Sequence, residues 1–347
     1  MKGHCESRTM KMQKDLIFAI VAVVIVVLVA AFVLWPRAPK GYSGKMESIT
    51  IGYSPFESTS LLWIAKDQHF LTSNGLNVTL RKYDTGVGSL DGMLNGETDI
   101  TVGTTEFPLV GRAFQKARIR TIGSIDKSEF VYLVGRKDRG IAKVSDLKGK
   151  RVGTTLRTIA EFHLGRFLGL HGLNMRDIIL IDVKKPAEWV NGVVNGDIDA
   201  IATAQPYAKL AKERLGANAV FWPAQGSQLQ YGLISSTEEW ITKHPEVVRR
   251  FLKSLAQAEE HAMRNPAEAK AIVHKALSLD PSYMETVWAQ NQFLLSLDQS
   301  LIAAMEDEAR WMIRNNMTSE KQVPDFLNYI YIDGLKAVKP EAVNIIR

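Results

Sequence analysis

Short polar loops recur along this chain, each directly after a stretch that is predicted to be a β-strand. In open α/β sheets, ligands bind outside the carboxyl ends of the strands. Several of these loops also run into predicted helices, whose N-termini offer free N–H groups and a partial positive charge. The sequence therefore predicts a site for a sulfonate, nitrate, carboxylate or phosphate group. The loops are 54–59, 84–89, 103–106, 154–158 and 205–207.

The candidate ligand-binding residues lie in or beside these loops. A single hydroxyl there is equally well explained as a helix N-cap, so the prediction rests on five loops shared between two similar halves. Phe56 and Tyr207 stand in the loops and are expected to contact the solute, whereas Trp63 and Trp189 are expected in the core. The full set is Ser54, Phe56, Thr59, Gly86, Thr104, Thr105, Glu106, Thr155, Thr158, Glu161, Gln205 and Tyr207.

Two acidic residues, Glu106 and Glu161, each follow a polar loop at the start of a predicted helix. One interpretation is that they only stabilise the helix dipole. The other is that they face the cleft, where each would pair with an amine or a heterocyclic N–H group.

Signals for catalysis or a cofactor are missing from the sequence. The seven histidines form no HExxH motif and no i, i+4 metal pair. There is no Walker lysine, and 52–56 (GYSPF) fails the G-x-S-x-G elbow at its last position. The single cysteine, Cys5, excludes an internal disulfide framework and an iron–sulfur cluster. We therefore predict no catalytic residue, no cofactor and no metal.

The composition is that of a folded protein with no nucleic-acid partner. The apolar fraction of 46% in 347 residues allows one or two domains with substantial cores. The net charge of +6 is modest, and the basic residues are spread along the chain rather than clustered.

Strands and helices alternate at short intervals, which is typical of an α/β sheet with crossover helices. Strands are expected at 48–53 and 76–81, with a helix at 61–70, and from about residue 238 onward the chain is expected to form a helical brace. The segments 93–102 and 193–202 share one pattern, in which a helix ends at glycine and an aspartate precedes a buried strand. This echo predicts two similar α/β halves.

The N-terminal region contains an unbroken apolar run at 16–35, which matches the length of a transmembrane helix. Basic residues before the run predict that 1–15 stays in the cytoplasm and that the body lies on the far side. A cleaved signal peptide and a buried core helix are the alternatives. A Pro/Gly/Lys-rich linker follows at 36–46.

Several longer motifs make the body resemble the solute-binding proteins of ABC importers for nitrate, sulfonates, taurine and thiamine precursors. They are IGYSPF, WIAKDQHFLTSNGLNV, LNGETDITVGTTEF, VSDLKGKRVGTT and VVNGDIDAIATAQPYA, within 49–266. The resemblance implies a two-lobed type II periplasmic-binding-protein fold that closes on one solute. Lobe one would hold 47–135 and 236–347, and lobe two 136–235.

The resemblance also implies a small-molecule solute and two protein partners, the permease and ATPase subunits of the importer. The family's contact loops fall on Ser54 and Phe56, on Gly86, on 104–106 and on 155–158. Acidic residues in a closed cleft would repel a simple anion, so we favour an aminosulfonate such as taurine, or a pyrimidine. An enzyme on the same fold and a solute-sensing receptor remain alternatives from other classes.

Overall fold

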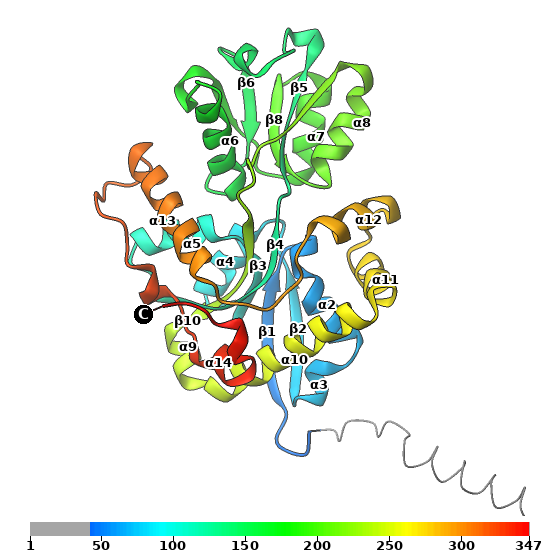
Figure 1. Cartoon of the computed structure of the whole chain (residues 1–347), viewed down its shortest axis with the longest axis vertical. Coiled ribbons are helices and arrows are strands. Elements are labelled where there is room, and N and C mark those ends of the chain that lie inside the picture. The colour runs from blue at the N-terminus through cyan, green and yellow to red at the C-terminus, as the bar shows by residue number, and fades with distance from the viewer. Residues whose placement is uncertain (1–41, 347) are drawn as a thin grey trace, which may run out of the picture. The chain divides into compact units, whose positions relative to one another are not determined.

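The computed structural model describes residues 42–346, without the side chains of Pro186, Ala187 and Ser282. In this range the strands form two five-stranded mixed sheets, and helices pack against each (Figure 1). The two-lobed α/β architecture expected from the sequence is therefore confirmed. The expected transmembrane helix, its linker and the cytoplasmic N-terminus lie outside the described residues except for 42–46. No helix among the described residues is long and apolar enough to cross a membrane.

The sheet of lobe one has the order β2-β1-β3-β10-β4. The first three strands are parallel, and β10 runs antiparallel to both of its neighbours. The β3 strand is buried along its whole length, as expected for a central strand covered on both faces. The bounds are β1 (Glu47–Tyr53), β2 (Leu76–Lys82), β3 (Ile100–Thr104), β4 (Ile119–Ser128) and β10 (Gln230–Thr237).

The sheet of lobe two repeats this plan with the order β7-β6-β8-β5-β9. Here β6 is parallel to β7 and β8, while β5 runs antiparallel to β8 and β9. The bounds are β5 (Val131–Arg136), β6 (Arg151–Thr154), β7 (Ile179–Asp182), β8 (Ala200–Ala204) and β9 (Ala219–Pro223).

Helices cover both sheets, and the C-terminal set lies on lobe one (Figure 1). The amphipathic α10 packs against α2, α3 and α14, and α13 packs against α5. Lobe one carries α2 (Ser60–Asp67), α3 (Phe70–Ser73), α4 (Gly86–Leu94), α5 (Glu106–Phe114), α9 (Glu238–Lys243), α10 (Pro245–Arg264), α11 (Pro266–Leu277), α12 (Pro281–Gln290), α13 (Gln299–Arg314) and α14 (Asp333–Val338). Lobe two carries α6 (Ile159–Leu170), α7 (Pro186–Asn195) and α8 (Tyr207–Leu215).

The chain crosses between the lobes twice, after β4 and before β10. Because β5 pairs in the second sheet and β10 in the first, the crossings lie at 129–130 and 224–229 rather than at 135 and 235. The buried Gln225 joins them: its Oε1 accepts hydrogen bonds from the Phe130 and Val131 N–H groups at 2.6 and 2.8 Å. Its Nε2 donates to the Ser128 carbonyl at 3.2 Å. One side chain thus holds both crossing segments in register.

The sequence echo is present in three dimensions. Gly96 and Gly196 both have positive φ, at 75° and 86°, as the turn after each helix requires. Asp99 then exchanges two hydrogen bonds with the backbone of Thr50 on the neighbouring strand, at 2.7 and 2.8 Å. Asp199 does the same with Arg151, at 2.9 and 2.8 Å.

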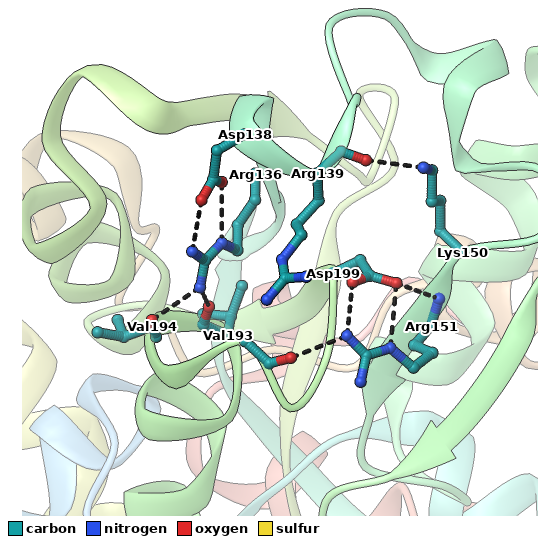
Figure 2. A network of polar contacts seen from close by, with 9 residues as sticks. Arg136, Asp138, Arg139, Lys150, Arg151, Val193, Val194 and Asp199 are labelled. Carbon is teal, nitrogen blue, oxygen red and sulfur yellow. Dashed lines mark hydrogen bonds and ion pairs between the residues drawn. The ribbon is translucent and has the colours of Figure 1, made fainter.

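In lobe two, two arginines bind the backbone carbonyl groups of this turn (Figure 2). The Arg151 guanidinium binds Asp199 at 2.7 Å and the Gly196 carbonyl at 2.8 Å. Arg136 donates to the carbonyls of Val193 and Val194 at the end of α7, at 2.9 and 2.7 Å. The cations therefore satisfy carbonyl groups that a helix C-terminus leaves open.

The lobes also touch beside the crossings, through α5, α6 and α13. Phe162 of α6 stacks on Phe107 of α5 at 5.6 Å between ring centroids and meets Trp311 of α13 edge-on at 5.6 Å. Arg166 of α6 pairs with Asp307 of α13 at 2.8 Å. We call these five residues the interlobe clasp.

Candidate ligand-binding site

A cavity of about 80 Å³ lies between the lobes, at the carboxyl ends of β1, β3, β6 and β8. It is much smaller than the roughly 300–1,000 Å³ of pockets for drug-sized ligands, so it suits a solute of few heavy atoms. Its lining residues are Ser54, Phe56, Ser58, Thr85, Gly86, Val87, Gly103, Thr105, Pro108, Phe130, Thr155, Thr158, Ile159, Ala160, Trp189, Ala202, Thr203 and Ala204.

The N-termini of three helices border this cavity. Their N-cap residues Thr85, Thr105 and Thr158 all line it, ahead of α4, α5 and α6. Thr85 caps the Gly88 N–H and Thr158 caps the Ala160 N–H, but the Thr105 hydroxyl caps nothing. N–H groups of the first turns therefore remain available to a ligand, in the positive field of three helix dipoles.

Ser54 contributes a hydroxyl that the fold itself does not use. It is only 1% exposed, and its Oγ has no hydrogen-bond partner within the described part of the chain. A buried hydroxyl without a partner costs free energy unless a ligand or water satisfies it. Its position on the cavity wall makes this hydroxyl available to a bound ligand.

The remaining walls are apolar and aromatic. Phe56 comes from lobe one and Trp189 from lobe two, and Tyr207 lies edge-on to both, with ring centroids 6.4 and 4.9 Å away. The Trp189 indole N–H donates to the Val183 carbonyl at 2.8 Å, which fixes the ring while leaving it exposed to the cavity. These walls suit the carbon body of a solute.

Charged side chains are missing from the lining. None of the eighteen lining residues is aspartate, glutamate, lysine, arginine, histidine or cysteine. A charge on the ligand would therefore be stabilised by hydroxyl and N–H dipoles alone. Such a site favours an oxyanion, whose oxygens accept hydrogen bonds, over an ammonium group, which can only donate them.

Six of the twelve residues predicted from the sequence line the cavity. They are Ser54, Phe56, Gly86, Thr105, Thr155 and Thr158. Gly86 permits a close approach of two loops, because a Cβ there would stand 3.2 Å from the Thr104 Cα atom. The Thr155 hydroxyl donates to the Val183 carbonyl at 2.7 Å and so holds its own loop in place.

The other six do not line the cavity. Thr59 and Thr104 use their hydroxyls to donate to the carbonyls of Phe56 and Gly86, at 2.8 and 3.1 Å. Gln205 Oε1 accepts a hydrogen bond from the Lys209 N–H at 3.0 Å. These three residues support the loops, and Tyr207 packs against the aromatic residues Phe56 and Trp189. The last two of the six are Glu106 and Glu161.

The two glutamates correct the expectation that acidic groups face the cleft. Glu106 is 1% exposed and points into lobe one, where its carboxylate accepts the Tyr231 N–H at 3.0 Å. Glu161 folds back to accept the Arg157 N–H at 2.6 Å. Burial raises the pKa of both carboxyl groups. Neither is placed to pair with a solute amine, so the reason for favouring an aminosulfonate falls away.

Sequence reasoning missed twelve lining residues, most of which are small or apolar. Four of them, Ser58, Thr85, Val87 and Gly103, lie within the predicted loops, and the hydroxyls of Ser58 and Thr85 carry the polar signal that marks those loops. Trp189 was assigned to the core, and its hydrogen bond inside lobe two agrees with that, yet its ring also borders the cavity. The apolar members carry no polar signal and are identified only by the fold.

The chain matches the family model described as NMT1/THI5 like over residues 58–269, more than half of its length. The chain belongs to this family. A Brucella abortus (strain 2308) protein named as a binding protein is 26% identical over 248 residues, which cover 69% of this chain and 74% of that protein. The taurine-binding periplasmic protein of Escherichia coli (strain K12) is 26% identical over 235 residues, covering 65% and 69% respectively.

The fold is also similar to that of a solved binding protein. The alkanesulfonate-binding protein SsuA from Xanthomonas axonopodis pv. citri, bound to MOPS, superposes with a TM-score of 0.71 at 21% sequence identity. The match covers 84% of this chain and 100% of that structure. At this identity the likeness establishes the two-lobed fold and nothing finer.

Proposed function

We propose that this chain is the solute-binding protein of an ABC importer, which captures a small organic oxyanion between its lobes and delivers it to a permease. The observation that carries the proposal is the cavity itself. Three helix N-termini and the unpartnered Ser54 hydroxyl line the same small cavity, whose other walls are apolar.

The lining favours a sulfonate with a short apolar body over an amine-bearing or a pyrimidine-like solute. Dipoles of N–H and O–H groups suit the three oxygens of a sulfonate. The rings of Phe56 and Trp189 suit its carbon chain, and no lining carboxylate is available for an ammonium group. Relatives named for binding taurine and alkanesulfonate support this solute class.

The importer also gives the proposed cellular setting. The partners are the permease and ATPase subunits, and the body lies in the periplasm or outside the cell. The apolar run 16–35 would tether it to the membrane as a single-pass helix.

An enzymatic role finds little support in the cavity. Its lining offers hydroxyl groups but no carboxylate, imidazole, thiol or amine to act as general base or nucleophile. The relatives named as binding proteins point the same way.

The test is a binding panel with the full-length chain purified in detergent. Isothermal titration would compare butane-1-sulfonate, taurine, nitrate and a pyrimidine, and native mass spectrometry would identify any solute that co-purifies. We expect butane-1-sulfonate to bind more tightly than taurine, because taurine's ammonium group finds no partner. Tight nitrate or pyrimidine binding without sulfonate binding would refute the solute class, and conversion of the bound compound would refute the binding role.

A further inference from the structure

Lobe one buries four carboxyl groups close to the cleft: Glu57, Asp126, Glu106 and Glu308. None of them forms an ion pair within residues 42–346. Buried carboxylates are normally paired, because removing a charge from water is costly. Four of them behind a site that is proposed to bind an anion call for an explanation.

Glu106 and Glu308 form a carboxyl pair between α5 and α13. Glu106 accepts a hydrogen bond from the Tyr231 N–H. Both Glu308 oxygens are buried without a hydrogen-bond partner among the described residues. Helices α5 and α13 pack together, and burial and the neighbouring Glu106 charge raise the pKa of Glu308. Two carboxyl groups can share a hydrogen bond only when one of them carries a proton. A buried carboxyl with no donor and no cation beside it favours its protonated form, so the two groups are expected to hold one proton between them.

This pair lies directly behind the proposed anion site. Glu106 is the first residue of α5, and its neighbour Thr105 lines the cavity. A negative charge on Glu106 would offset the positive field at the N-terminus of α5 and would repel a bound anion. Glu57 has a similar position, because the residues on either side of it, Phe56 and Ser58, also line the cavity.

We propose that Glu106 and Glu308 are a proton-binding site coupled to the cleft, and that an anionic solute is captured when this pair is protonated. The coupling rests on the proposed function for its ligand, whereas the proton site rests on the geometry of lobe one. Binding an anion would then draw in a proton, and loss of the proton would weaken binding.

The groups around the pair reinforce proton retention. Asp307 and Asp126 add negative charge from α13 and β4, while Arg166 of α6 is the cation that partly opposes them and is itself paired with Asp307. The Tyr231 ring belongs to β10, and its hydroxyl donates to the Ser300 hydroxyl at 2.8 Å rather than to the pair. Burial and the mutual repulsion of the carboxylates raise the pKa of Glu308 well above its usual range.

The first experiment titrates butane-1-sulfonate into the full-length chain from about pH 5.5 to about pH 9, in buffers of different ionisation enthalpy. We expect proton uptake on binding and a Kd that rises about tenfold toward high pH, the effect of one nearby charge at an effective dielectric constant of about 20. In Glu308→Gln the pH dependence and the proton uptake should shrink. Glu306→Gln, a change at a half-buried position of the same helix that affects only the pair with Arg310, should keep the wild-type profile.

A wild-type Kd that does not change with pH, or a Glu308→Gln profile that matches wild type, would overturn the coupling while leaving the solute-binding function intact. If butane-1-sulfonate fails to bind at every pH, the proposed solute class is wrong, and the proton site is decided by unfolding. Urea unfolding of wild type should lose stability as pH rises, and Glu308→Gln should lose less; equal losses would overturn the site. Glu106→Gln serves the same purpose if Glu308→Gln does not fold.

Discussion

Ser54 is the residue at which ligand affinity and protein stability are expected to move in opposite directions. Its buried hydroxyl has no partner in the described chain, so Ser54→Ala removes an unsatisfied group from the ligand-free protein. We expect an unchanged or higher melting temperature without ligand. The Kd for butane-1-sulfonate should rise about three- to tenfold, the worth of one hydrogen bond.

Calorimetry and thermal unfolding of the same preparation measure both effects. The exposed Ser145→Ala on lobe two is the control and should change neither value. Lower stability together with unchanged affinity would show that Ser54 is structural.

At this scale the sequence predicts polar loop residues well and side-chain direction poorly. Ser54, Thr105 and Thr158 were found because strand-end loops that enter helices have a recognisable composition. Glu106 has the same local signal as Thr105. It turns away because β10 and α13, which are distant in sequence, supply its surroundings.

Because α6 forms part of the interlobe clasp, it should tolerate an alanine at Gly169 but not at Gly165. A Cβ atom at Gly165 would stand 2.3 Å from the Trp311 Cζ2 atom, whereas one at Gly169 would meet nothing within 4 Å. Gly165→Ala should therefore displace Trp311 and cost about 1–3 kcal/mol. Gly169→Ala should stabilise by about 0.5–1 kcal/mol, because alanine favours the helix.

Urea unfolding measures both changes, and small-angle scattering reports whether the lobes separate in Gly165→Ala. If the two alanine variants behave alike, the clasp does not hold the lobes together.

At the crossing segments, the side chain of Gln225 is expected to hold the two segments together. Gln225→Ala removes the acceptor of the Phe130 and Val131 N–H groups and leaves them buried without a partner. We expect a loss of about 1–3 kcal/mol in the free energy of unfolding. Faster hydrogen exchange at residues 129–131 would locate the effect, and the exposed Gln322→Ala is the control. Unchanged exchange there would contradict the assigned role.

Helices and strands were predicted correctly where the hydrophobic periodicity is strong. The predictions failed where contacts between segments distant in sequence determine the structure. The helix expected at 61–70 is interrupted at His69, which has a φ of 57°. No glycine or proline marks this break in the sequence. The lobe boundaries were displaced because β5 and β10 look like ordinary strands. Only their pairing shows which sheet each one joins.

For the whole molecule, the buried acids predict that stability falls as pH rises. Burial raises the pKa values of Glu57 and Asp126 to about 7, so the folded state holds protons that the unfolded state releases. The contribution of these groups to stability is fully present below their unfolded pKa of about 4 and is lost as pH rises to about 7, by up to about 3–4 kcal/mol for each group. Urea unfolding at several pH values measures this decline. A free energy that is constant or rises from about pH 5 to about pH 8 would contradict it.

The order of strands also bears on how the chain folds as it is synthesised. Lobe two is one uninterrupted segment, 131–223, whose first and last strands pair at Tyr132 and Pro223. In lobe one, β10 lies between β3 and β4, so that sheet stays open until residue 237 has been made. Lobe two can therefore complete its sheet on the ribosome first, although lobe one begins earlier in the chain. The unfinished edges of β3 and β4 are the surfaces that would need protection during that interval.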